Sequence, residues 1–90
     1  MSVKVEIPTP MREQADGQTE VEVEGGTVGE ALNSLVEKHP ALKTKLFDGD
    51  RIRPFINVFV NDEDIRYLDE MDTKVADGQL VVLIPSVAGG

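Results

Sequence analysis

The chain ends in Gly89 and Gly90, whose carboxylate is the group in this sequence best placed for enzymatic chemistry. Glycine has no Cβ, so a Gly-Gly tail can enter a slot that is too narrow for other residues. The apolar run 80–84 and Pro85 come just before the tail, which predicts a strand leading directly into it. The competing interpretation is an ordinary frayed terminus, because two terminal glycines arise by chance in about one chain in 200.

The other candidate reactive groups lack the partners that catalysis or metal binding requires. His39 is the only histidine and no Gly-x-Ser-x-Gly motif accompanies it, so a solvated position at a helix end is favoured. The glycine-rich stretch 25–29 has no Walker lysine, and the acidic stretch 61–64 lacks the spacing of a calcium loop. Ser86 has no base nearby. The sequence therefore predicts neither catalytic residues nor a metal site.

Size and composition exclude several classes of function. Ninety residues are enough for one modest core, and the absence of cysteine excludes disulfides, thiolate zinc sites and iron–sulfur clusters. No signal peptide and no apolar run of about 20 residues occurs, so we expect a cytoplasmic protein without a membrane span. The formal charge of −8 disfavours nucleic-acid binding and favours a basic protein partner, although solubility or adaptation to high salt explains it equally well.

The first half of the chain predicts a hairpin followed by a helix. Apolar and polar residues alternate over 3–7 and again over 19–23, the period of half-buried strands, and 13–18 reads as a turn or short loop between them. Thr27 and Glu30 then match a capping box, and apolar residues follow at helical spacing. This helix has one apolar stripe, which indicates that it covers one face of a sheet.

The second half predicts two strong strands and several short elements. A short helical turn is expected over 41–47, and the strongest central-strand pattern covers 55–60. A turn at 61–64 leads to a short strand over 65–67. The last strand, 79–84, is apolar on both sides, which suggests a central position in the sheet. The predicted class is α+β, with one main helix packed on one face of a mixed sheet.

The two faces of this sheet are expected to serve different purposes. Phe59, Val82 and Ile84 share the face opposite the helix, and an exposed apolar patch there predicts a docking site for a partner protein. The alternatives are that Ile65 or Tyr67 covers these side chains, or that the register is reversed. The face towards the helix should carry the apolar residues Ile56, Val58, Val60, Val81 and Leu83.

The predicted order of elements resembles the β-grasp fold of ubiquitin. Together with the ending Val87-Ala88-Gly89-Gly90, it resembles the ubiquitin-like sulfur carriers, a family that includes the small subunit of molybdopterin synthase and the thiamine-pathway carrier. The stretches 7–10, 60–66 and 85–90 look most like the carrier of thiocarboxylate-dependent cysteine biosynthesis. The segment 39–42, with the following Phe47 and the stretch 56–58, is similar to archaeal ubiquitin-like modifiers of the same family. Ser86 replaces a proline that molybdopterin-type tails more often carry.

The resemblance implies a function in which this chain is the substrate rather than the enzyme. A partner similar to ubiquitin-activating enzymes would use ATP to adenylate Gly90, and a sulfur donor would then leave a thiocarboxylate there. A second enzyme, with a cysteine synthase as the candidate, would accept the sulfur, and this chain itself would bind no cofactor. The implied organisation is a ubiquitin-like domain over 1–84 and a flexible tail over 85–90. Residues Pro85, Val87 and Ala88 of that tail are then expected to contact the partner beside the apolar patch.

Three other functions remain compatible with the same residues. The chain could be a protein modifier that is joined through Gly90 to lysines of target proteins, or a sulfur donor for molybdopterin, thiamine or tRNA thiolation. It could also be a β-grasp interaction domain whose glycines have no chemical role. The acceptor of the sulfur is not encoded in this chain, because that selectivity resides in partner surfaces.

Overall fold

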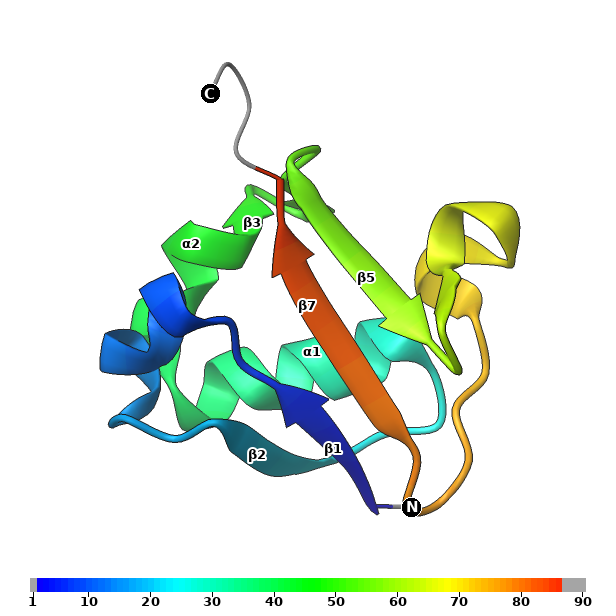
Figure 1. Ribbon diagram of the computed structural model, residues 1–90, viewed down its shortest axis with the longest axis horizontal. Coiled ribbons are helices and arrows are strands. Elements are labelled where there is room, and N and C mark those ends of the chain that lie inside the picture. The colour runs from blue at the N-terminus through cyan, green and yellow to red at the C-terminus, as the bar shows by residue number, and fades with distance from the viewer. Residues whose placement is uncertain (1, 87–90) are drawn as a thin grey trace.

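The protein forms a five-stranded mixed sheet with one helix packed across it (Figure 1). A computed structural model describes residues 2–86. The sheet order is β2-β1-β7-β5-β6. Its strands are β1 (Ser2–Glu6), β2 (Glu20–Glu24), β5 (Ile56–Val60), β6 (Glu63–Asp64) and β7 (Leu80–Pro85). The helix on the sheet is α1 (Val28–Lys38).

Short elements connect the strands on the helix side and at the edges. The α2 helix (Lys43–Leu46) leads into a separate two-stranded sheet of β3 (Phe47–Asp48) and β4 (Arg51–Ile52). The 3-10 helices are η1 (Thr9–Ala15), η2 (Pro40–Leu42), η3 (Ile65–Tyr67) and η4 (Glu70–Asp72). Across residues 2–86, no helix is both long enough and apolar enough to cross a membrane.

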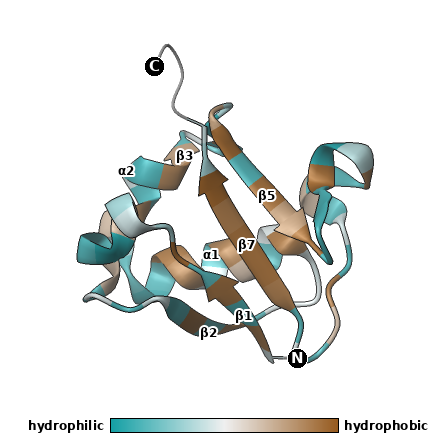
Figure 2. Ribbon diagram, in the orientation of Figure 1, coloured by the Kyte–Doolittle hydropathy of each residue, from teal (hydrophilic) through white to brown (hydrophobic). Residues whose placement is uncertain are grey.

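The β7 strand lies at the centre of the sheet, as its apolar sequence predicted. It pairs in parallel with β1 and antiparallel with β5, and its ladder with β5 runs from Val81 opposite Val60 to Pro85 opposite Ile56. Figure 2 shows the apolar character of β7 along its length. The predicted hairpin of the first two strands is also confirmed, because β1 and β2 pair antiparallel.

The start of α1 follows the predicted cap, with one difference. The Thr27 hydroxyl accepts a hydrogen bond from Glu30 N at 3.2 Å, as an N-cap does. The Glu30 carboxylate, however, accepts from Gly26 N at 2.8 Å, one residue ahead of the position expected for a capping box. This bond holds the Gly25-Gly26 turn against the helix, and a Cβ on Gly25 would lie only 2.7 Å from Ala31 N.

The core lies between α1 and the sheet, and the predicted division of the faces is confirmed. The five residues predicted to face the helix are all buried, and Val81 is completely inaccessible. Residues from α1, η1 and the loops complete this layer. Its remaining large members include Ile7, Met11, Leu32, Leu35, Leu42, Leu46 and Ile65.

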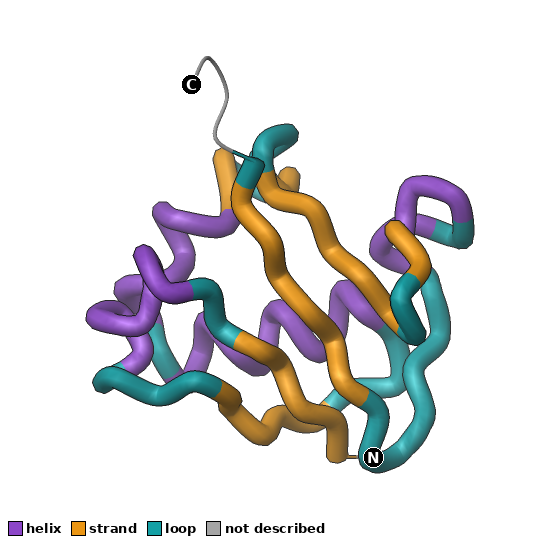
Figure 3. Tube along the Cα trace, in the orientation of Figure 1, coloured by secondary structure: helices purple, strands orange, loops and turns teal. Residues whose placement is uncertain are grey.

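Two predicted local structures are wrong. Residues 13–15, expected within a turn or short loop over 13–18, are the end of η1, which buries Met11 and Ala15 against the core, and the turn begins only at Asp16 (Figure 3). The short strand expected at 65–67 is instead η3, because Asp64 Oδ1 accepts a hydrogen bond from Arg66 N and starts a helical turn. Pairing with β5 therefore stops at Asp64.

Candidate functional site: the open sheet face and the end of β7

An apolar patch occupies the face of the sheet opposite α1. The strand registers place Phe59 beside Val82, and Ile84 beside Asn57, on this open face. Ile84 is 45% exposed, whereas Phe59, Leu80 and Val82 are half-buried. We call Phe59, Leu80, Val82 and Ile84 the open-face patch. The sequence predicted three of these four and missed Leu80, which continues the same alternation along β7.

No second layer from the segment after β6 covers this patch. Ile65 is buried in the core on the other side, and Tyr67 is 86% exposed. The alternative in which either residue packs over Phe59 is therefore wrong. The predicted docking residues Phe59, Val82 and Ile84 share one accessible surface, which satisfies the geometric requirement of a docking site.

Acidic side chains border the open-face patch on the side of β1 and β2. In the register, Glu6 lies next to Val82, and Glu20 lies next to Glu6 on the following strand. Lys4 lies between Glu22 and Leu80 in the neighbouring row. Because the acidic residues outnumber this lysine, the border favours contact with a basic surface.

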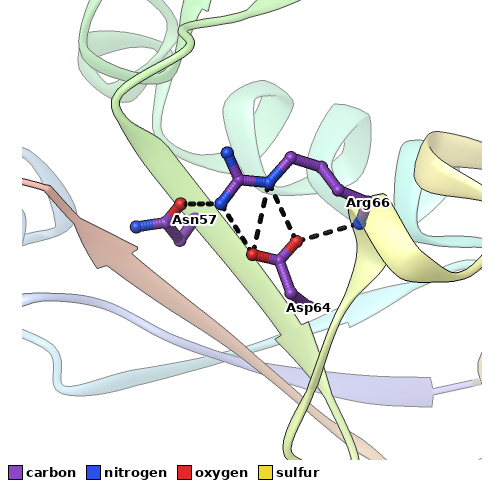
Figure 4. A network of polar contacts seen from close by, with 3 residues as sticks. All are labelled: Asn57, Asp64 and Arg66. Carbon is purple, nitrogen blue, oxygen red and sulfur yellow. Dashed lines mark hydrogen bonds and ion pairs between the residues drawn. The ribbon is translucent and has the colours of Figure 1, made fainter.

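A polar network borders the patch on its other side (Figure 4). Arg66 donates to Asp64 through Nη2 at 2.7 Å and through Nε at 3.2 Å, and Nη2 also donates to Asn57 Oδ1. These hydrogen bonds from Arg66 hold the pKa of Asp64 below its ordinary value of 3.8, and they raise the pKa of Arg66. The sequence did not predict this network, because no motif links residues 57 and 66.

The described chain leaves the sheet at the edge of the open-face patch. Pro85 is the last residue of β7, and its ring removes an N–H on the side of β7 that faces β1 rather than β5. Ser86 N then donates to Phe55 O at 2.6 Å, which fixes the direction of the exit beside the exposed Ile84. The predicted roles of Val87, Ala88, Gly89 and Gly90 concern residues that lie outside the described part of the chain.

His39 is less solvated than the sequence suggested. Its side chain is 12% exposed, and Nδ1 lies 3.6 Å from Asp16 Oδ2. It terminates α1 through its backbone N–H, which donates to Leu35 O. Within residues 2–86, no three His, Cys, Asp or Glu side chains are grouped so that they could hold a metal ion.

Comparison with known proteins identifies a family over nearly the whole chain. The profile of the ThiS family matches residues 5–90. The sulfur carrier protein CysO of Mycobacterium tuberculosis is 37% identical over 93 aligned positions, and the alignment covers 100% of both chains. The small archaeal modifier protein 3 of Haloferax volcanii is 38% identical over 64 positions, which are 71% of this chain and 70% of that protein.

A solved structure supports the same assignment. In the crystal structure of the Amycolatopsis orientalis BexX/CysO complex, one chain superimposes with a TM-score of 0.89 at 39% identity. The match covers 98% of this chain and 99% of that chain. The β-grasp fold predicted from the order of the elements is therefore confirmed.

Proposed function

The chain belongs to the ThiS family of ubiquitin-like sulfur carriers, and we propose that it carries sulfur as a thiocarboxylate on Gly90. The similarity to CysO carries this proposal, because that alignment extends over all of both chains and so includes Gly89 and Gly90. The relatives are small carriers rather than catalysts, and we assign the same role to this chain. The catalytic groups would come from its partners.

The proposed chemistry begins at the terminal carboxylate, which is a poor electrophile because its charge is delocalised and solvated. An activating enzyme would join the Gly90 carboxylate to AMP and release pyrophosphate from ATP. A hydrosulfide nucleophile would then attack the carbonyl carbon and expel AMP, which leaves the thiocarboxylate. Gly89 and Gly90 suit this reaction because the carbonyl must approach both nucleotide and nucleophile within about 3–3.5 Å.

The open-face patch supports the docking of an activating enzyme. Ile84 belongs to the patch and is two residues from Ser86, so a partner that covers the patch also receives the departing chain. The acidic border at Glu6 and Glu20 adds a preference for a basic partner surface. For these reasons we assign the open-face patch as the binding surface for the enzyme that would act at Gly90.

We propose cysteine biosynthesis as the destination of the sulfur. The support is the full-length similarity to CysO proteins, together with the Ser86 that distinguishes this tail from the molybdopterin type. The accepting enzyme would then be a cysteine synthase. Transfer to molybdopterin, thiamine or tRNA is the alternative outcome.

Intact-mass spectrometry of protein isolated from its own cells tests the thiocarboxylate directly. Exchange of one oxygen for sulfur at the terminus adds their mass difference, and treatment with iodoacetamide should then add one alkyl group. The chain contains no cysteine, so an alkylated thiol cannot come from a side chain. A protein that never gains mass or alkylation, even after sulfide and ATP are supplied in the cell extract, would contradict the proposal.

Modification of other proteins through Gly90 is the second candidate function. The specific observation in its favour is the 38% identity to a small archaeal modifier protein. Expression with an N-terminal tag leaves the C-terminus available for both functions. A ladder of tagged proteins that is lost on removal of Gly90 would support the modifier, whereas a single alkylated species without a ladder would support the carrier alone.

A further inference from the structure

The first half of β5 has a free edge. Asp64 and Glu63 of β6 pair only with Phe59 and Val60, and no other strand in residues 2–86 pairs with β5 on that side. The segment of η3 and η4, yellow in Figure 1, accordingly lies beside the end of β5 rather than along it.

Specific backbone groups face this free edge. Ser86 N donates to Phe55 O across the β5–β7 ladder, so Phe55, Asn57 and Phe59 direct their backbone groups towards β7. Antiparallel ladders alternate, and the groups of Ile56 and Val58 therefore point away from β7. Ile56 N donates to Arg53 O, in agreement with this alternation. The Ile56 carbonyl and the Val58 N–H are therefore directed towards the edge of β5 that faces away from β7.

An apolar pocket of about 230 Å³ opens beside these two groups. Ile56 and Val58 form one wall, and Pro54, Ile65 and Met71 contribute to the others. Clefts that take small-molecule ligands usually measure about 300–1,000 Å³, so this pocket suits one or two apolar side chains better than a cofactor. A free strand edge beside a pocket of this size is the arrangement that receives an added peptide strand.

Arginines surround the pocket in a chain that is otherwise strongly acidic. Three of the four arginines, Arg51, Arg53 and Arg66, line this pocket or the adjoining hollow, and they offset the acidic residues Asp50, Asp64 and Glu70 of the same lining. The Arg66 side chain is 58% exposed, whereas the side chain of its partner Asp64 is only 10% exposed. This pair therefore presents its cation, rather than its carboxylate, to an incoming chain.

From these observations we infer that the free edge of β5 binds an extended segment of another protein that carries an apolar anchor flanked by carboxylates. In an antiparallel segment, the residue two positions before the anchor would accept from Val58 N–H, and the anchor residue itself would donate its N–H to the Ile56 carbonyl. Its apolar side chain would enter the pocket, and a neighbouring carboxylate would meet Arg66 or Arg53. This site includes no residue of the open-face patch and does not involve the chemistry at Gly90, so it goes beyond the proposed function.

Nuclear magnetic resonance of the full-length, 15N-labelled protein tests this inference with a defined probe. The probe is the acetylated and amidated peptide DVLVE, titrated at 0.15 M salt, where the Debye length of about 8 Å limits repulsion from distant acids. The Val58 amide signal should shift, and its hydrogen exchange should slow on addition of the peptide. Before addition, Val58 N–H should exchange faster than Phe59 N–H, which faces β7.

Three altered peptides separate the contributions of backbone, anchor and charge. An N-methyl group on the central leucine removes one strand hydrogen bond and should weaken binding about two- to tenfold. Replacing that leucine by glycine should abolish detectable binding, and the peptide NVLVQ should bind several times more weakly. Equal affinities for the parent and the N-methylated peptide would overturn the inference.

Protein variants and the location of the chemical-shift changes complete the test. Arg66→Gln should weaken binding about two- to tenfold, while Lys38→Gln, the same charge change at the far end of α1, should leave it unchanged. Shifts confined to Phe59, Val82 and Ile84 would place the peptide on the open-face patch and overturn the site. A Val58 signal that moves with protein concentration alone would assign the edge to a second copy and also overturn it.

Discussion

Ser86 donates its backbone N–H to Phe55 O at 2.6 Å, and this contact sets the direction in which the chain leaves the sheet. The bond lies directly after Pro85, which pairs with Ile56 but has no N–H of its own. The start of β5 thus supports the end of β7 next to the open-face patch. A partner that binds this surface meets the start of the tail in a defined orientation.

Phe59→Asp should weaken recognition by the activating enzyme while the fold persists. Phe59 is half-buried on the open face, and the substitution would place a second carboxylate opposite Asp64. We expect the KM for the carrier to rise at least about tenfold, since buried aromatic anchors often dominate binding. Pyrophosphate release by the activating enzyme measures this KM, and urea unfolding should show a loss of only about 1–2 kcal/mol.

Tyr67→Asp is the matched control for that variant. Tyr67 is 86% exposed on η3 and does not belong to the open-face patch, so its substitution should leave the KM unchanged. Global unfolding of Phe59→Asp would show that Phe59 is a core residue instead, and an equal change in KM for both variants would show that it has no docking role.

Removal of Gly90, or the addition of residues after it, should abolish thiocarboxylate formation and leave the domain folded. The described core ends with β7, which buries Val81 and Leu83 well before the tail. We therefore expect unchanged thermal unfolding but no alkylation by iodoacetamide. An extended variant that still forms an acyl adenylate at its own terminus, at the normal rate, would argue against activation at Gly90.

Asp64→Asn should lower stability at neutral pH and have no effect in acid. The hydrogen bonds from Arg66 hold the pKa of Asp64 below 3.8, so the carboxylate stabilises the fold above this value. That contribution is lost as the pH falls through the lowered pKa, where the wild-type side chain becomes neutral as well. Melting temperatures from neutral pH to well below 3.8 should therefore converge for the two proteins.

Asp72→Asn serves as the control for this pH dependence. Asp72 is an exposed residue of η4. The melting temperature of Asp72→Asn should differ from that of the wild type by the same amount at every pH. If Asp64→Asn still melts below the wild type at the lowest pH, the amide disturbs packing, and the loss of the carboxylate charge is not the cause.

Gly25→Ala should destabilise the domain, and Gly26→Ala should do so much less. A Cβ on Gly25 would lie 2.7 Å from Ala31 N and 3.0 Å from Ala31 Cα, which are backbone atoms of α1 that cannot move independently. The resulting overpacking should cost about 1–3 kcal/mol in urea unfolding. At Gly26, the nearest atom is the movable Glu30 Oε1 at 3.4 Å, and similar losses in both variants would refute the proposed clash.

The sequence predicted best those elements in which the spacing of apolar residues determines which side chains are buried. The β5 and β7 strands differ from β1 and β2 because both of their faces are apolar, and the structure places β7 in the centre accordingly. Thr27 and Glu30 likewise marked the start of α1 through local hydrogen bonds. In each case the signal lies within a few consecutive residues.

Features that depend on contacts between distant residues were missed. Met11 and Ala15 carry no strong helical pattern, and only the tertiary fold makes η1 bury them. Arg66 meets Asn57 because the Asn61-Asp62 turn, with both φ values positive, folds β6 back on β5. The open face could be predicted from alternation alone, but the network at its border could not.

The central place of β7 also has a mechanical consequence. A pull on the end of this strand acts along its length, so the hydrogen bonds to β1 and β5 bear the load together in shear. An edge strand would instead peel away from a single neighbour. A partner that pulls on the carboxyl end of β7 must therefore break both ladders together before the domain unfolds.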